Sequence, residues 1–316
     1  MRLYAYLMLV TGLTASPAVG QSSLGGIAGS PMRMGFGARG IGLGNAMTAV
    51  ITGDVSSYYN PALVPFQATP VGLASYGFLS LDRRLNFVSY TQSLKPAAGI
   101  SVGILNAGVS NIDGRNRDGV HTEDYSTSEN AFFLSFGLKP DESVAIGVTT
   151  KILYYSLYEN IHSTTVGVDL GGIYVLSEDW TIGAAIQDIG SKYKWDTSKL
   201  YGRLGNATED RFPLRKRIGV SYAPIGSGVL GTVEFEAIGS STFFRVGAEL
   251  RFIEGFQLRG GIDEISPSRE VSPRPSVGFT FQTQGTTWSP AIHYSYVDEP
   301  YAPSPLHILA ITLRFE

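Results

Sequence analysis

Two glycine motifs and a few scattered histidines are the residues whose types and spacing could support chemistry. Gly99 to Gly103 reads G-x-S-x-G, which in hydrolases presents a nucleophilic serine on a strand-to-helix turn. Gly35, Gly37 and Gly40 match G-x-G-x-x-G, which binds the pyrophosphate of a dinucleotide. The histidines, which could act as bases or metal ligands, are His121, His162, His293 and His307.

The surroundings of these motifs argue against catalysis. Gly99 to Gly103 lies inside a segment of alternating apolar residues, and the other motif has no strand before it and no βαβ unit around it. The histidines lack H-E-x-x-H spacing, and the chain has no cysteine. We therefore expect no enzymatic activity, no catalytic residue, no cofactor and no metal. With 24 basic and 27 acidic residues, the chain also lacks the basic surface that nucleic acid binding requires.

Charged side chains alternate with apolar ones in three successive segments of the last third of the chain. A strand places alternate residues on opposite faces, so each segment has one apolar face and one charged face. The charged faces carry Glu234, Glu236, Arg245, Glu249, Arg251, Arg259 and Asp263. We expect opposite charges to meet across neighbouring strands in a barrel lumen. The alternative is that each charge faces lumen water.

Fourteen segments alternate in this way from about residue 71 to the C-terminus. They are 71–80, 85–94, 98–109, 131–139, 143–157, 164–176, 180–190, 216–224, 229–239, 242–253, 256–264, 276–283, 287–296 and 307–316. Short turns fill every second gap, and the other gaps hold the long polar connections, such as 110–130 and 191–215. We therefore predict an all-β transmembrane β-barrel of about fourteen antiparallel strands over residues 70–316. The alternative is a secreted β-sandwich, which does not require so many strands with sorted turns.

The first twenty residues have the pattern of an export signal. Met1 and Arg2 are followed by an apolar stretch from Leu3 to Leu13, and Ala18 and Gly20 provide small residues for cleavage after Gly20. We predict that residues 1–20 are a signal peptide; the alternative is a membrane anchor, for which the stretch is too short. An exported barrel of this kind belongs in the bacterial outer membrane, with membrane lipid as its partner.

Residues 21–69 are rich in small residues and do not alternate. Dense glycine allows close backbone packing, Asp54 is placed to cap a short helix through Ser57, and Asn60-Pro61 favours a turn. We expect this segment to form a plug of short helices inside the barrel. Its motif consists of Gly37, Ala38, Arg39, Gly42, Gly44, Asp54, Asn60, Pro61 and Ala62.

This motif, with Thr48-Ala49 and Leu63, resembles the N-terminal signature of the FadL-like outer-membrane barrels, and most closely that of their PorV/PorQ branch. The resemblance is detailed over about residues 30–66. In the PorV/PorQ branch it implies a type IX secretion component that docks secreted cargo or secretion-system proteins, which is the function we expect. In the FadL branch it implies a channel for long-chain fatty acids or other hydrophobic compounds, with a hydrophobic small molecule in the lumen, and this is the alternative.

A FadL-like channel also implies a break in an early strand, through which the substrate leaves sideways. Asn106 and Gly108 fall on the otherwise apolar outer face of the third segment, and Pro290 lies within the thirteenth. These residues could mark a bulge or a missing ladder bond, so they are the candidate lateral opening. The alternative is that the third segment has reached the headgroup region at Asn106. The same register predicts that Glu249→Gln is tolerated, whereas Leu250→Arg is not.

Overall fold

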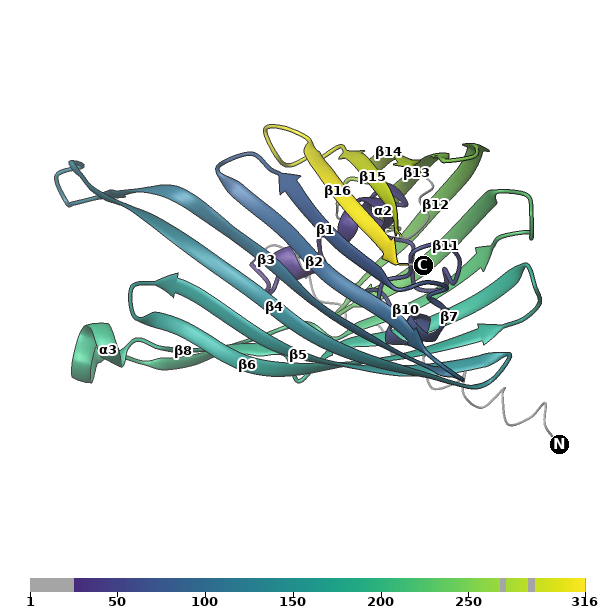
Figure 1. Ribbon diagram of the computed structural model, residues 1–316. Helices are drawn as coiled ribbons and strands as arrows, with labels where there is room; N and C mark the ends of the chain where they lie inside the picture. Colours follow the sequence, from purple (N-terminus) through teal and green to yellow (C-terminus); the bar gives the residue numbers. More distant parts are fainter. Residues whose placement is uncertain (1–25, 268–270, 284–287, 316) are drawn as a thin grey trace.

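The alternating segments form one closed antiparallel barrel in the computed structural model, which describes residues 26–267, 271–283 and 288–315 (Figure 1). Fourteen strands make up the barrel, as predicted, and each pairs with its neighbour in sequence except where β7 pairs with β10. Pairing of β16 with β1, from Val71 opposite Arg314 to Phe78 opposite His307, closes the ladder. The predicted signal peptide, residues 1–20, lies outside the described residues.

The barrel strands are β1 (Val71–Phe78), β2 (Arg83–Leu94), β3 (Ala98–Arg115), β4 (His121–Asp141), β5 (Val144–Tyr158), β6 (Ile161–Val175), β7 (Trp180–Ile189), β10 (Arg215–Tyr222), β11 (Val229–Ile238), β12 (Ser241–Ile253), β13 (Phe256–Ile265), β14 (Arg274–Gln282), β15 (Trp288–Val297) and β16 (Leu306–Phe315). The helices are η2 (Pro31–Arg33), α2 (Gly37–Gly42), η3 (Pro61–Phe66), α3 (Ser198–Tyr201) and η4 (Gly202–Leu204). No helix among the described residues is both long and apolar enough to cross a membrane.

The period of two assigns the faces of the strands. In β12, Phe244 and Leu250 point outward and are 41% and 44% exposed, whereas Arg245 and Glu249 point inward and are 3% and 9% exposed. Pairing preserves these faces, because Arg245 lies opposite Glu234 of β11. The barrel therefore has an apolar exterior and a polar stretch of interior where the sequence predicts them.

Two of the predicted long loops contain strands. Residues 110–130 continue β3 to Arg115 and begin β4 at His121, so these strands form a hairpin that extends beyond the rest of the barrel (Figure 1). Residues 191–215 contain a second hairpin, β8 (Lys192–Asp196) with β9 (Ala207–Arg211). Both hairpins lie at the end of the barrel opposite the one where β16 ends (Figure 1). Polar residues on both faces hid these strands from the apolar alternation, which appears only where one face is buried.

The N-terminal segment fills part of the barrel interior, where α2 contacts β13 to β16 and η3 contacts β2 to β6 (Figure 1). Small residues on both sides allow this packing. A Cβ atom at Gly261 of β13 would collide with the backbone of Leu43 and Gly44, and Gly44 itself has a φ of +60°. Glycine is needed at position 261 because the backbone of β13 and that of the N-terminal segment are in direct contact there.

Asn60, rather than Asp54, caps a helix of this segment. The Asn60 side chain accepts a hydrogen bond from the Ala62 backbone N–H at 3.0 Å and donates to the Thr48 and Gly172 carbonyls at 2.9 and 3.1 Å. The expected helix cap at Asp54 is wrong, because residues 51–60 form bends and turns and both Asp54 carboxylate oxygens bind Arg314, at 2.8 and 2.7 Å. A charged partner binds a carboxylate more strongly than a backbone N–H does.

The closed ladder predicts resistance to SDS. Because the described strands leave no open barrel edge, unzipping must begin inside the sheet, so unboiled protein should stay folded and run faster than boiled protein on a gel. Electrophoresis of the same sample before and after boiling measures this. Identical migration of the two samples would contradict a closed barrel.

Candidate functional site: a lumen with one charged and one apolar wall

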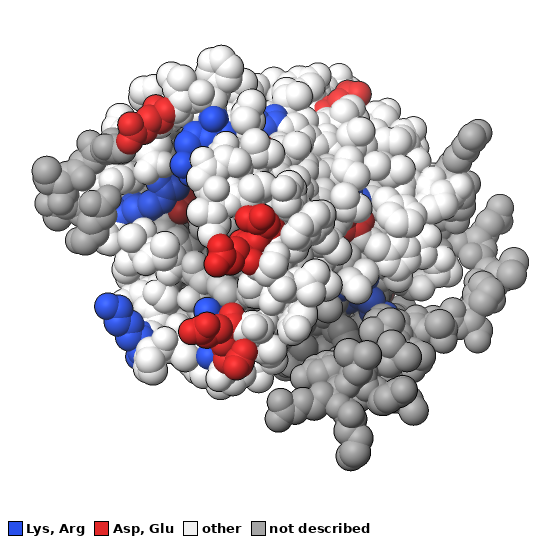
Figure 2. All heavy atoms as spheres, turned by 90° about the vertical axis from the view of Figure 1, so that its right-hand side faces the viewer, with Lys and Arg blue, Asp and Glu red and all other residues white. Residues whose placement is uncertain are grey.

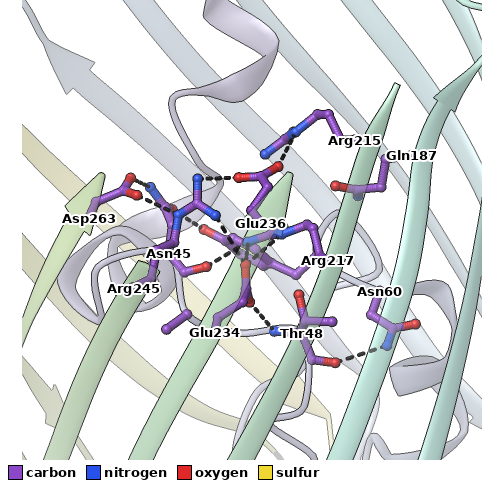
Figure 3. Close-up of polar contacts among 12 residues, drawn as sticks. Asn45, Thr48, Asn60, Gln187, Arg215, Arg217, Glu234, Glu236, Arg245 and Asp263 are labelled. Atoms are coloured by element: carbon purple, nitrogen blue, oxygen red, sulfur yellow. Dashed lines mark hydrogen bonds and ion pairs between the residues drawn. The ribbon is translucent and has the colours of Figure 1, made fainter. Parts of the chain in front are cut away.

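Strands β10 to β14 carry a cluster of buried charges on the lumen side (Figure 3). The Nε of Arg215 donates to Glu236 at 2.6 Å, and the Nε of Arg217 donates to Glu234 at 2.6 Å. Arg245 lies between the carboxylates of Glu234, Glu236 and Asp263 and forms ion pairs with all three. Each of these charges is nearly inaccessible to solvent, so the pairing offsets a desolvation cost of several kcal/mol per ion.

The charged cluster also binds the N-terminal segment. Glu234 accepts a hydrogen bond from the Thr48 backbone N–H at 3.0 Å, and Arg217 donates to the Asn45 carbonyl at 2.7 Å (Figure 3). The Asn45 side chain in turn donates to Asp263 at 2.7 Å. The loop after α2 is therefore fixed to the strands by charge-assisted hydrogen bonds.

A second group of charges binds α2 itself. The guanidinium of Arg39 binds both carboxylate oxygens of Glu249, at 2.8 and 3.1 Å, and donates to the Thr52 and Asp54 carbonyls at 2.9 Å each. Arg259 donates to the same Glu249 carboxylate at 3.1 Å. The expectation that Glu249→Gln is tolerated does not agree with this geometry, because two buried arginines depend on that carboxylate.

The seven charges predicted to face the lumen are distributed unevenly. Glu234, Glu236, Arg245, Glu249, Arg259 and Asp263 are buried and joined in the two clusters just described. Arg251 has the same parity but is exposed, and it lines a cavity at the end of the barrel where β16 ends. Figure 2 faces this end, where acidic and basic side chains are interspersed among uncharged ones.

Sequence reasoning missed several members of the clusters. Arg215 and Arg217 of β10 have the lumen parity, because Ile218 and Val220 point outward, and this signal was present in the sequence. Arg274 of β14, which pairs with Asp263 and Glu299, follows the same rule. The partnership of Arg39 with Glu249 has no local signal, because 210 residues separate them.

The opposite wall of the lumen is apolar. It is formed by side chains of β2 to β5 and β16 that are nearly or fully buried, namely Leu85, Phe87, Leu105, Phe133, Leu153 and Ile308. The ring of Phe36, from the N-terminal segment, packs against Phe87 with centroids 4.8 Å apart and against Phe133 with centroids 5.5 Å apart. The N-terminal segment thus contacts one wall through charges and the other through apolar rings.

Two cavities lie along this apolar wall. The first, which we call the amphipathic cavity, has Met32, Leu105, Phe133 and Leu153 on one side and Lys151 and Gln187 on the other. The second, the inner cavity, is lined by Phe36, Met47 and Leu73. Phe36 borders the inner cavity and contacts Phe133 of the amphipathic cavity, so its ring stands between them.

The strand ladder is continuous at the residues predicted to form a lateral opening. Asn106 pairs with Asn86 of β2 and Asn130 of β4, and its side chain donates to Asn130 at 2.7 Å and accepts from Asn86 at 3.3 Å. This row of amides joins three strands on the outer face. The register shift of β3 lies further on, between Val109 and Ile112, where Asn111 has a φ of 54°.

Gly108 and Pro290 both fit within a continuous wall. Glycine at 108 leaves space for Arg84 of β2 to cross β3 and donate to the Thr127 carbonyl of β4 at 3.2 Å. Pro290 is the third residue of β15 and lies opposite Leu313, and its carbonyl accepts from the Thr283 N–H at 3.0 Å. Proline is accommodated there because the ladder to β14 ends at Ala291.

The polar residues that could have supported catalysis have structural partners. Ser101, in the G-x-S-x-G motif, lies within β3 and hydrogen-bonds to Thr91 at 2.8 Å and Ser57 at 3.1 Å. His293 is buried between Thr280 and Thr312, at 2.8 and 2.9 Å. These contacts tie the strands to each other and to the N-terminal segment.

The ion pairs that hold the N-terminal segment predict unequal losses of stability for two arginine substitutions. Arg39→Met leaves Glu249 with a single partner and should lower the free energy of unfolding by about 3–5 kcal/mol, as expected for a broken buried pair. Arg314→Met removes a pair whose side chains are 18% and 10% exposed and should cost less, about 1–3 kcal/mol. Urea unfolding followed by tryptophan fluorescence measures both. An equal or smaller loss for Arg39→Met would show that α2 is held by other contacts.

No protein-family model matches the chain, and no curated protein matches its sequence. Several solved structures are similar to it in fold. The CymD monoaromatic hydrocarbon channel is similar with a TM-score of 0.65 and 11% identity, over 90% of this chain and 98% of that one. The toluene transporter TodX of Pseudomonas putida has a TM-score of 0.59 and 12% identity, over 88% of this chain and 96% of that one. A FadL homologue of Pseudomonas aeruginosa has a TM-score of 0.60 and 8% identity, over 88% and 98%. The chain therefore has the barrel fold of these two hydrocarbon channels and of the FadL homologue.

Proposed function

We propose that this protein is an outer-membrane channel for hydrophobic small molecules. The observation that carries the proposal is the buried apolar wall inside a closed barrel, with the amphipathic cavity lying against it. A barrel that served only as a membrane anchor has no need of an apolar lumen wall. Hydrophobic compounds, in contrast, partition into such a surface because it removes them from water.

The outer surface supports insertion into a membrane. Large apolar side chains point outward from strands all around the barrel, among them Val88, Phe132, Ile146, Val166, Ile218, Val233, Phe279 and Ile311. A closed ladder satisfies the backbone hydrogen bonds that lipid cannot satisfy. Together with the export signal expected from residues 1–20, this supports residence in the bacterial outer membrane.

The activities of the similar structures support the same function. CymD is a monoaromatic hydrocarbon channel, and TodX is a toluene transporter. At 11% and 12% identity they show a shared fold, and their activity enters only as support for this proposal.

The proposed route runs along the lumen. A compound in the amphipathic cavity is separated from the inner cavity by the ring of Phe36. The inner cavity adjoins the cavity at the end where β16 ends, since Arg39, Asp54 and His293 line both. Movement of Phe36 would connect the spaces. The route does not use Asn106, Gly108 or Pro290, because the ladder is continuous there.

Docking in type IX secretion is the second candidate function. The observation that favours it is the continuous ladder together with the ion-paired N-terminal segment, since a docking protein needs no path through its wall or lumen. Deletion in the native host separates the candidates. Loss of surface-attached type IX cargo with normal hydrocarbon uptake would favour docking, and the reverse result would favour the channel.

Membrane insertion predicts that the stability lost on replacing an outward-facing residue by arginine depends on the depth of that residue in the bilayer. Val233 lies near the centre of β11 and Val229 at its end, and they are 52% and 44% exposed on the outer face. Val233→Arg should cost about 2–4 kcal/mol of stability in lipid, and Val229→Arg about 0–1 kcal/mol. Urea unfolding in vesicles measures both. Equal costs would contradict a bilayer around β11.

If ligands bind in the amphipathic cavity, a larger side chain that fills the cavity should weaken their binding. Ala131 lines this cavity, so Ala131→Phe should weaken binding of toluene and of a sixteen-carbon fatty acid by about tenfold or more. Ala248→Phe adds the same ring on the outer face of β12 and is the matched control. Equilibrium dialysis against labelled ligand, with the barrel in nanodiscs and empty nanodiscs subtracted, is the measurement. Wild-type protein that binds neither compound would refute the channel.

A further inference from the structure

The polar side of the amphipathic cavity is built differently from a carboxylate-binding site. Lys151 is the cation that borders the cavity from β5, and its ammonium group pairs with Asp169 at 2.7 Å and also with Asp188. Two carboxylates thus share one ammonium group. A ligand carboxylate would have to compete with Asp169 and Asp188, which also line the cavity, for that ammonium group.

The other cation that borders the cavity, Arg215, is likewise ion-paired. Arg215 donates from its Nε to Glu236 at 2.6 Å, and both side chains are buried. Thr149, a neutral polar residue of the same lining, shares a hydrogen bond of 2.7 Å with Ser135. The charges of the cavity are therefore balanced by the protein itself, and a charged ligand would have to displace an existing buried pair.

Gln187 is the exception on this side. Its Nε2 donates to the Tyr58 carbonyl at 2.6 Å, which fixes the amide orientation, because a carbonyl can only accept. Its Oε1 is buried and has no hydrogen-bond partner among the described residues, and the residue as a whole is 2% exposed. A buried acceptor without a partner is costly, and a ligand that donates a hydrogen bond would remove that cost.

We propose that the amphipathic cavity selects neutral hydrophobic compounds that carry one hydrogen-bond donor, such as a phenol or an alcohol, over hydrocarbons without a donor and over carboxylates. The apolar part contacts Met32, Leu105, Phe133 and Leu153, and the ligand hydroxyl donates to Gln187 Oε1. This inference rests on the proposed channel function and narrows its substrate class.

The test compares three probes with the same ring system on the barrel in nanodiscs: naphthalene, 1-naphthol and 1-naphthoate. Wild-type protein should bind 1-naphthol about tenfold more tightly than naphthalene, the value of one hydrogen bond to an otherwise unpaired acceptor. It should bind 1-naphthoate more weakly than naphthalene. Equilibrium dialysis with empty nanodiscs subtracted gives the three dissociation constants.

Gln187→Met assigns the effect to the acceptor. Methionine has a similar shape and no amide oxygen, so the preference for 1-naphthol should disappear while naphthalene binding is unchanged. Gln257→Met, which makes the same change on β13 in the cavity that Arg251 lines, should leave both constants as in the wild type.

The outcomes separate this inference from the function on which it rests. If naphthalene and 1-naphthol bind the wild type equally, or if 1-naphthoate binds most tightly, the selection for a neutral donor is wrong and the hydrophobic channel stands. If none of the three probes binds, both proposals fail. A preference for 1-naphthol that survives in Gln187→Met would also overturn the role of Gln187.

Discussion

Buried ion pairs between the N-terminal segment and the barrel wall are the interaction on which the rest of this structure depends. Arginine and glutamate inside a barrel of this size lose most of their hydration, so each charge must have a partner within reach. Arg39 supplies a partner for Glu249, and Asp54 supplies one for Arg314. The segment is therefore required by the charges of the wall, and the wall positions the segment.

This pairing divides the lumen into two unlike halves. The charges of β10 to β14 fix the loop after α2 on one side, which directs Phe36 toward the apolar residues of β2 to β4 on the other. The remaining space lies along the apolar wall, where the two cavities are found. A hydrophobic compound can occupy this space without disturbing the ion pairs, so the charged wall is a scaffold for the apolar one.

Two further features shape the barrel wall: strand glycines that let the N-terminal segment lie close to the strands, and a row of asparagines across β2 to β4. Gly247 and Gly261 allow Leu43 and Gly44 to lie directly on the strands, because a Cβ atom at either glycine would collide with that backbone. On the outer face, Asn86, Asn106 and Asn130 hydrogen-bond across β2 to β4, so each of these amides has at least one partner on an otherwise apolar surface. The wall is thereby continuous where the sequence alone suggested weakness.

The sequence by itself determined what depends on local periodicity. Alternation with a period of two predicted fourteen barrel strands and the inward direction of residues such as Arg245 and Glu249. It could not show that Arg251 is exposed despite its parity, that residues 110–130 pair as strands, or that Asp54 binds Arg314. Nor could it find the unpartnered oxygen of Gln187 beside an apolar wall. These features join residues far apart in the chain, and only barrel closure brings such residues together, because strand periodicity carries no information about which distant side chain will face a given position.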